Sequence, residues 1–527
     1  MSQDFGRRTE IPDASSLVDH FVDRHIREGR GSKTAMLSDE RTWTYAQVAD
    51  LVNRVGNGLQ KLGVRPGDRV LLVLLDSVEF AACYFGAMKI GGVAVPTNPY
   101  LRAQDYAYFL DESQARVLVA DASVQPELES VIERRSHLRH AIVVGARGGS
   151  GIAWEDWIAN SSPGPQVSWE SRNEAAFWLW TSGSTGMPKA AVHRGIDWEH
   201  CCERYARGVL GICGNDVTYS SSKLFHAYGL GNALMFPFHV GAATVVDPRK
   251  PQARSLLEKV QRHKPTLFFS VPTLYAAMLE LIDASDAYDF SSVRHAVSAA
   301  EPLPAEIFRK WKQRFGMEIL DGVGSTEVLH IYLSSHPGRA KAGSSGRPVE
   351  GYDLRLIDEK GNDVAQGVVG DLIVRGGSTA SCYWNREKLS AERMRGEWFY
   401  TGDRFSVDAD GYFRFAGRSD DMFRCSGQWV SPLEVENALV EHPAVLEAAV
   451  APFEQANGLV TPKAFIVLRH GFVQSTDLIR ELQQHVKQTI SPYKYPRRIE
   501  FLEELPRNPA GKLLRHLLGT RATRDPR

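Results

Sequence analysis

RVLLVLLDSVEFAACYFGAMKIGGVAVPTNP, residues 69–99, reads as a strand, a helix and a second strand. The apolar run of residues 69–75 has the length of a buried strand, and residues 77–91 have the length of a helix. Residues 91–99 form a second apolar run that ends at a turn containing proline and asparagine. This order predicts two parallel strands joined by a helix that crosses one face of the sheet.

The same alternation extends from about residue 69 to residue 321. The helix-like stretches 103–113 and 253–263 are each followed by a short apolar run, residues 115–121 and 266–270. Repeated strand–helix–strand units are typical of parallel sheets with helices on their faces. The predicted fold class is therefore α/β, with a large N-terminal domain of this kind.

The pattern changes after about residue 351. Short strand-like runs separated by Gly- and Asp-rich turns predict a small antiparallel or barrel-like section; they are residues 352–358, 370–376 and 411–418. The C-terminal part reads as helix, strand, strand and helix, which predicts a small α+β domain. We expect an N-terminal domain of residues 1–418, a hinge at residues 419–421 and a mobile C-terminal domain of residues 422–527.

Composition excludes several classes of protein. The chain has 62 Lys+Arg and 63 Asp+Glu, a net charge of −1, whereas nucleic-acid-binding proteins usually carry a basic surface. Its six cysteines form no CxxC pair that would indicate a zinc site or a redox dithiol. Apolar stretches fall far short of the ~20 residues that a membrane helix needs, and the N-terminus lacks a secretory apolar run. We expect a cytoplasmic globular protein whose partners are neither nucleic acid nor membrane.

A loop rich in Ser, Thr and Gly, TSGSTGMPK, follows the strand-like AAFWLW. Glycines allow the backbone to approach phosphate oxygens closely, and hydroxyls and a lysine add donors. The spacing differs from that of the ATPase phosphate loop, and a flexible surface loop is the alternative that composition leaves open. The candidate phosphate ligands are Thr181, Ser182, Gly183, Ser184, Thr185, Gly186 and Lys189.

Further motifs follow this loop in order. They are SAAEPLP (298–304), DGVGSTE (321–327), YTGD (400–403), GRSDD (417–421), GQWVSPLEVE (427–436) and PRNPAGK (506–512). Together with the loop they resemble the motifs of the adenylate-forming superfamily, which comprises acyl-CoA synthetases, adenylation domains and luciferases. The resemblance covers roughly residues 15–515.

This resemblance implies a reaction in two halves that uses ATP, Mg²⁺ and coenzyme A. A carboxylate attacks the α-phosphate of ATP to give acyl-AMP and pyrophosphate, and a thiol then displaces AMP. By resemblance, Glu327 binds magnesium, Thr326 bonds the α-phosphate, and Lys512 bridges the carboxylate and phosphate. Read locally, Glu327 is an ordinary helix-start carboxylate and Lys512 an exposed lysine in a turn.

The resemblance also implies contacts to adenosine and coenzyme A. Asp403, which we expect to follow Gly402 in a tight turn, would accept from both ribose hydroxyls, and Arg418 would contact ribose or phosphate. Asp420 would be the hinge residue, and Gly427 would leave room for pantetheine. The residues expected around the base are Ala299, Ala300, Glu301, Pro302, Asp321, Gly322 and Val323.

Two stretches of sequence indicate the class of carboxylic acid that is the substrate. KLFHAYGLGN (223–232) and GVGSTEVLHIYLSS (322–335) resemble those of benzoate-, hydroxybenzoate- and aminobenzoate-CoA ligases. By this resemblance His226 gates access to the α-phosphate, and His330 bonds the carboxylate or a ring substituent. A core histidine is the alternative for both. The expected pocket residues are Ala227, Tyr228, Gly229, Gly324, His330 and Ile331.

The predicted function is therefore an aryl-CoA ligase for benzoate or an amino- or hydroxybenzoate. An aryl-AMP ligase that loads a carrier protein and a short aliphatic acyl-CoA synthetase remain open. A nucleotide-binding protein without activity is disfavoured, because Thr326, Glu327, Asp403 and Lys512 are all present. Similar enzymes occur as homodimers, but no stretch of this sequence specifies an interface.

Overall fold

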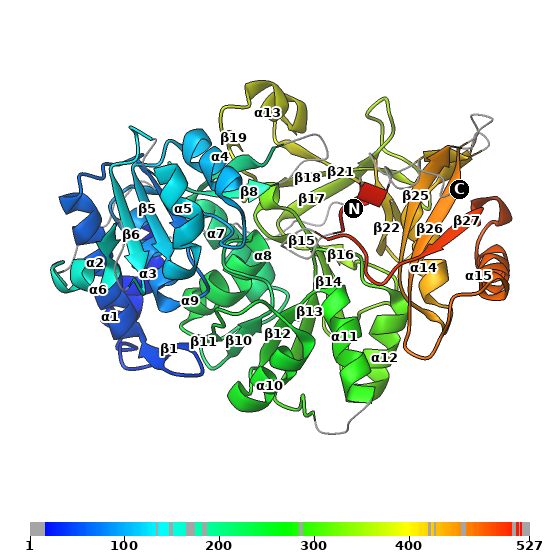
Figure 1. Ribbon diagram of the computed structural model, residues 1–527, viewed down its shortest axis with the longest axis horizontal. Coiled ribbons are helices and arrows are strands. Elements are labelled where there is room, and N and C mark those ends of the chain that lie inside the picture. The colour runs from blue at the N-terminus through cyan, green and yellow to red at the C-terminus, as the bar shows by residue number, and fades with distance from the viewer. Residues whose placement is uncertain are drawn as a thin grey trace, which may run out of the picture. The chain divides into compact units, whose positions relative to one another are not determined.

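The computed structural model describes residues 16–132, 135–146, 151–164, 174–181, 187–283, 288–419, 423–425, 428–454, 460–507, 513–515 and 517–518. The chain divides into two compact units, and Figure 1 labels many of their helices and strands. The first unit comprises the described residues up to Pro251 together with Gly377–Arg386. The second comprises Gln252–Gly376 and the described residues from Glu387 onward.

The predicted strand–helix–strand unit is present in the first unit as β3 (Arg69–Val73), α3 (Val78–Lys89) and β4 (Val93–Pro96). β3 pairs in parallel with β4 and with β5 (Val117–Asp121), as predicted. The sheet has the order β19 (Cys382–Tyr383), β9 (Lys189–Arg194), β8 (Ala175–Thr181), β4, β3, β5, β6 (His140–Val144) and β7 (Ile152–Ala153).

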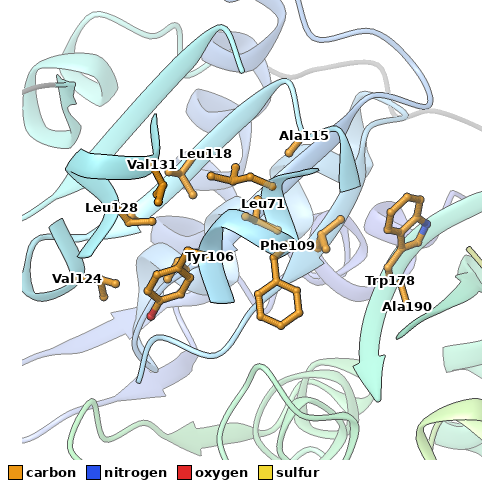
Figure 2. Close-up of a cluster of buried hydrophobic side chains, with 14 of the residues drawn as sticks. Leu71, Tyr106, Phe109, Ala115, Leu118, Val124, Leu128, Val131, Trp178 and Ala190 are labelled. Atoms are coloured by element: carbon orange, nitrogen blue, oxygen red, sulfur yellow. The ribbon is translucent and has the colours of Figure 1, made fainter. Parts of the chain in front are cut away.

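One face of this sheet is covered by α4 (Ala103–Ser113) and α5 (Gln125–Ile132). Figure 2 shows Tyr106 of α4 and Leu128 of α5 close to Leu71 of β3 in one buried apolar cluster. Burying each such side chain is worth about 1.5–3 kcal/mol. Because side chains alternate along a strand, Val70 and Leu72 point to the opposite face.

Helix α3 packs closely against α2 (Tyr45–Lys61). Ser77 caps α3 by accepting a hydrogen bond from the Phe80 amide, and almost every α3 side chain is buried. At Gly86 a Cβ atom would lie 2.6 Å from Cγ1 of Val55 and 3.1 Å from the Val52 carbonyl oxygen. A glycine at this position therefore lets the two helices approach closely.

The remaining strands of the first unit are β10 (Val217–Ser220), β11 (Ala243–Val245), β1 (Thr34–Leu37) and β2 (Thr42–Thr44). β11 pairs in parallel with β10 and β1, and β2 pairs antiparallel to β1. The other helices of this unit are η1 (Asp19–Asp23), α1 (Arg24–Arg27), η2 (Ala122–Val124), α6 (Trp154–Ala159), α7 (Gly195–Cys201), η3 (Cys202–Arg207), α8 (Ala227–Leu230), η4 (Gly231–Met235) and α9 (Phe236–Val240).

The second unit begins with another parallel section. β12 (Leu267–Ser270), β13 (His295–Ser298) and β14 (Ile319–Gly324) are parallel, and β15 (Ile331–Ser334) and β16 (Arg347–Pro348) add antiparallel strands. Its helices are α10 (Ala253–His263), α11 (Pro272–Asp283), α12 (Ala305–Phe315) and η5 (Thr326–Val328).

The predicted antiparallel section is confirmed. It contains β17 (Tyr352–Ile357), β18 (Gly370–Gly376), β20 (Met394–Arg395), β21 (Trp398–Val407) and β22 (Phe413–Arg418), with the short helix α13 (Glu387–Arg393). All pairings between these strands are antiparallel.

The C-terminal part has the predicted order of helix, strand, strand and helix. These elements are α14 (Pro432–Val440), β25 (Val445–Glu454), β26 (Val460–Leu468) and α15 (Thr476–Thr489). Three strands and a short helix were not predicted: β23 (Phe423–Cys425), β24 (Gln428–Val430), η6 (Pro492–Lys494) and β27 (Arg498–Phe501). No helix in the part of the chain that the structure describes is both long and apolar enough to cross a membrane.

The close contact of α2 with α3 gives a test of this packing. We expect Gly86→Ala to destabilise the protein by about 1–2 kcal/mol, because overpacking outweighs the gain in helix propensity. A shorter side chain at position 55 makes room, so Val55→Ala combined with Gly86→Ala should lose less stability than the sum of the single changes. Thermal unfolding of the four proteins measures this, and strict additivity would contradict it.

Candidate active site

In the first unit, the ends of the predicted phosphate loop lie side by side. Thr181 at the end of β8 is paired with Lys189 at the start of β9 in an antiparallel register. The Lys189 ammonium lies 4.3 Å from the ring centroid of Tyr383, a residue of β19 that the sequence did not single out. The intervening Ser182, Gly183, Ser184, Thr185 and Gly186 lie outside the described residues.

His226 immediately precedes α8 in the first unit. Its ring lies 4.3 Å from that of Phe225, and its buried Nε2 atom has no hydrogen-bond partner among the described residues. Burial lowers the pKa of this imidazole to about 4. The ring is therefore neutral near pH 7 and can donate one hydrogen bond without supplying a positive charge.

The first turn of α8 carries Ala227, Tyr228 and Gly229, and Ala227 and Tyr228 are partly exposed. Gly229 has a packing role that the sequence did not reveal. A Cβ atom there would lie 2.2 Å from the Lys223 carbonyl oxygen and 2.4 Å from that of Ser222. Only glycine allows this close approach of the helix to the preceding segment.

In the second unit, parallel strands bring two predicted nucleotide-binding segments to one edge of the sheet. Ala299, Ala300, Glu301 and Pro302 follow β13, and Asp321, Gly322 and Val323 lie in the last part of the adjacent β14. Ala300 has φ +72°, an uncommon conformation for a residue other than glycine. Such strained residues cluster at functional sites.

Asp321 is a buried carboxyl group, 5% exposed. Ser345 forms a hydrogen bond with the Asp321 side chain. The Oδ1 atom of Asp321 has no hydrogen-bond partner among the described residues. Burial raises the pKa of Asp321 to about 8. This Oδ1 atom is one of several buried side-chain atoms without a partner in the part of the chain that the structure describes.

A cavity of about 210 Å³ in the second unit adjoins Asp321. Its lining includes Pro302 and Ala305 at the start of α12, Ser345, and Arg414 and Phe415 of β22. The lining is mixed, with apolar groups such as Pro302 and Phe415 beside polar ones such as Ser345 and Arg414.

The segment from Ser325 to Ile331 is sharply folded. Ser325 Oγ accepts a hydrogen bond from the Val328 amide, which caps the short helix η5 that carries Thr326 and Glu327. Leu329 has φ +71° and ψ −47°, and the His330 amide donates to the Val328 carbonyl oxygen across it at 2.9 Å. This arrangement is a strained γ-turn, which returns the chain as β15. No pattern in the sequence predicted this turn.

Close packing explains two glycines next to this turn. At Gly322 a Cβ atom would lie 2.6 Å from Cδ1 of Ile331, so the Ile331 side chain covers this glycine. At Gly324 a Cβ atom would lie 2.6 Å from the His330 carbonyl oxygen. His330 and Ile331 are both buried, 3% and 1% exposed.

Asp403 and Arg418 face each other on neighbouring strands. They are direct partners in the pairing of β21 with β22, and their charged groups lie 3.4 Å apart. The expected tight turn at Gly402 is wrong, because both Gly402 and Asp403 lie within β21. Gly402 has φ +77°, and a Cβ atom there would lie 2.9 Å from the Arg393 guanidinium.

Glu301, predicted near the base, is held by two groups. Its carboxylate accepts from the Thr273 hydroxyl at 2.7 Å and from Arg507 at 3.1 Å. Arg507 also bonds Glu447 at 2.8 Å, a role not anticipated for this residue of the PRNPAGK motif. The predicted Lys512, the hinge residue Asp420 and the coenzyme A residue Gly427 lie outside the described residues.

A protein-only metal site is absent from the described ranges, which contain no group of three or more His, Cys, Asp or Glu side chains able to hold a metal. Glu327 supplies a single, 8% exposed carboxylate. Mg²⁺ in phosphate-transfer sites commonly takes one or two carboxylates and completes its shell with phosphate oxygens and water. The donor set is therefore compatible with magnesium carried in with a nucleotide.

Comparison with known proteins covers nearly the whole chain. The family described as AMP-binding enzyme matches residues 22–384, and the AMP-binding enzyme C-terminal domain matches residues 434–512. A benzoate–CoA ligase from Thauera aromatica is 43% identical over 97% of this chain and 96% of its own.

Two solved structures are similar in fold as well as sequence. The anthranilate CoA ligase AuaEII in complex with anthranoyl-AMP has a TM-score of 0.93 at 40% identity and covers 98% of both chains. A benzoate CoA ligase from Burkholderia xenovorans LB400 has a TM-score of 0.89 at 38% identity, covering 96% of this chain and 99% of its own. The predicted fold class is confirmed, and the chain belongs to the AMP-binding enzyme family that its motifs resemble.

Proposed function

We propose that this protein is an AMP-forming aryl-CoA ligase, which activates benzoate or a ring-substituted benzoate as the aryl-AMP and transfers the acyl group to coenzyme A. The observation that carries the proposal is the 43% identity, over 97% of the chain, to a benzoate–CoA ligase. The names of the similar proteins favour an aromatic acid over an aliphatic one, and coenzyme A over a carrier protein.

The first half-reaction joins two anions, so the protein must position them and offset their charge. The TSGSTGMPK loop, whose ends Thr181 and Lys189 are paired between β8 and β9, would bind phosphate oxygens together with the Lys189 ammonium. Thr326 would donate its hydroxyl to the α-phosphate. Lys512 would bridge this phosphate and the attacking carboxylate, where an ammonium group stabilises the charge that develops in the transition state.

Magnesium bound by Glu327 would neutralise phosphate charge. Only one protein carboxylate is assigned to the ion, so the nucleotide's own oxygens would supply the other anionic ligands. The burial of Glu327 restricts its rotamers and limits competition by water.

The cavity beside Asp321 is the proposed site of adenine. The unpartnered Oδ1 atom of Asp321 can accept a hydrogen bond from the exocyclic amino group, while Pro302 and Phe415 offer apolar surface to the ring. Asp403 would accept from the ribose hydroxyls. Arg418, 3.4 Å from Asp403, would hold that carboxylate in place.

The acid would be recognised by residues assigned through the family resemblance. These are His226, Ala227, Tyr228, Gly229, Gly324, His330 and Ile331. A neutral His226 can donate to a carboxylate or phosphate oxygen, which a core histidine with a satisfied ring would not do.

The second half-reaction requires coenzyme A to reach the aryl-AMP. We propose that residues 422–527 form a small domain that turns about a hinge at residues 419–421, with Asp420 as the pivot. Removal of Lys512 from the phosphate by this turn would leave Gly427 beside the path of pantetheine.

The proposed function is tested by a panel of acids. With ATP, Mg²⁺ and coenzyme A, we expect AMP release and an aryl-CoA product, detected by mass, for at least one of benzoate, 2-amino-, 2-hydroxy- and 4-hydroxybenzoate. Acetate and octanoate serve as aliphatic controls. Activity with the aliphatic acids alone would exclude the aryl assignment, and accumulation of aryl-AMP without thioester would indicate a carrier protein as acceptor.

Lys512→Ala separates the two half-reactions. Loss of the ammonium should slow formation of aryl-AMP by at least about 100-fold, comparable with the loss of an oxyanion donor. The variant should still convert supplied aryl-AMP and coenzyme A to the thioester. Lys360→Ala, at an exposed lysine in a turn, is the matched control. Equal loss of both half-reactions in Lys512→Ala would contradict the hinge proposal.

Asp321 gives a prediction about pH. The folded pKa of about 8 lies above the ordinary value of 3.8, so between these values the folded protein holds a proton that the unfolded chain releases. The contribution of Asp321 to the free energy of unfolding therefore falls as pH rises, by at most about 1.4 kcal/mol per pH unit. Asp321→Asn should raise the melting temperature relative to wild type increasingly from pH 5 to pH 8. A difference that does not change with pH would contradict it.

The same position tests the adenine site. Asp321→Asn keeps an oxygen acceptor and should leave the KM for ATP within about twofold, whereas Asp321→Leu removes it and should raise this KM about tenfold, the value of one buried hydrogen bond. Equal KM values for ATP in the two variants would contradict a hydrogen bond between Asp321 and adenine.

A further inference from the structure

A buried ion pair lies just before His226 in the first unit. The Lys223 ammonium is 3.5 Å from Oδ2 of Asp76, and these side chains are 9% and 6% exposed. Lys223 also donates to the Asp247 carbonyl oxygen at 2.5 Å. Lysine and aspartate are seldom this deeply buried, so the pair needs an explanation.

The pair fixes the backbone that leads to His226. Oδ1 of Asp76 accepts from the Leu224 amide at 3.0 Å, while the Lys223 carbonyl oxygen accepts from the His226 amide at 3.0 Å. Asp76 thus holds both the side chain of Lys223 and the backbone of the next residue. The turn from Lys223 to His226 is closed by the second of these hydrogen bonds.

The first turn of α8 packs against residues 222 and 223. The Cα of Gly229 packs directly against the carbonyl groups of Ser222 and Lys223, so the position of the helix follows that of the lysine. Since α8 begins at Ala227, a displacement of residues 222–224 would move both the His226 ring and the first turn of the helix.

A contribution to the stability of the fold does not by itself explain why this ion pair is buried. Removing two charges from water is costly, and burial raises the pKa of Asp76 despite the nearby ammonium. Apolar residues of similar volume often replace a buried ion pair without loss of stability. A directional pair that binds both side chain and backbone instead restricts the segment to one geometry.

We propose that Asp76 and Lys223 are positioning residues that set the His226 ring and the first turn of α8 for the carboxylic acid. This inference rests on the proposed function, in which His226 and α8 contact the acid. Neither Asp76 nor Lys223 needs to touch the substrate, because both act through the backbone of residues 224–227.

The test compares Lys223→Met, which keeps the length of the side chain, with Lys463→Met. Lys463 is a matched control, since it is also buried, 6% exposed, and paired at 2.8 Å with Glu500 in the second unit. We expect Lys223→Met to raise the KM for the aromatic acid at least tenfold and to alter the ranking of ring-substituted acids. The KM for ATP should stay within twofold, and Lys463→Met should change neither constant.

A second, more conservative variant distinguishes a change in positioning from a loss of folded protein. Asp76→Asn retains an oxygen acceptor for the Leu224 amide but loses the charge opposite Lys223, so a smaller shift in the same direction is expected. A general loss of folded enzyme would lower kcat for every acid and leave KM and the ranking of acids unchanged. That result for both variants would overturn the positioning role.

Hydrogen exchange followed by mass spectrometry gives a readout that does not require activity. Peptides covering residues 221–230 should exchange faster in Lys223→Met and Asp76→Asn than in wild type, while peptides from β3 and α3 should not change. Unchanged exchange at 221–230 would overturn the inference even if the wild type proved inactive. An inactive wild type with faster exchange in the variants would instead contradict the proposed function alone.

Discussion

Parallel pairing fixes the edge of each sheet at which functional groups gather. Strands that run in one direction end together, and polar residues can follow them without interrupting a buried ladder. In the first unit β3 ends at Val73 and is followed by Asp76. In the second, Ala299–Pro302 follow β13 beside the end of β14. The helices that cross between the strands supply the apolar burial that keeps this edge in place.

Several candidate site residues have a strained backbone or a buried polar atom without a partner. Ala300 and Leu329 adopt positive φ, and His226 Nε2 and Asp321 Oδ1 are buried without partners among the described residues. Each of these features costs stability, which the packed sheets and helices must offset. In the proposed function, bound nucleotide would supply a hydrogen bond to Asp321, and the acid or a phosphate oxygen would accept one from His226.

The sequence predicted those helices and strands whose buried residues recur at regular spacing. Apolar runs and amphipathic spacing located β3, α3, β4 and the C-terminal helices, because burial on one face imposes a period. The pair formed by Lys223 with Asp76 depends on a contact between residues far apart in the sequence. The hairpin β23–β24 and the γ-turn at Leu329 are local, but both are too short to impose a periodic pattern. The motif around Asp403 identified the residue but not its place within a strand, since Gly402 suits a turn and an extended bulge equally.

Glycines in the acid-binding motifs show why pocket size is hard to derive from sequence. Small residues at positions 229 and 324 suggest open space for a ring, yet backbone carbonyl groups occupy the place of a side chain at both. These glycines are therefore required by the fold and carry no information about the width of the pocket. In the proposed function, discrimination among acids would instead depend on side chains such as Tyr228 and His330, and on the backbone geometry of the segment before His226.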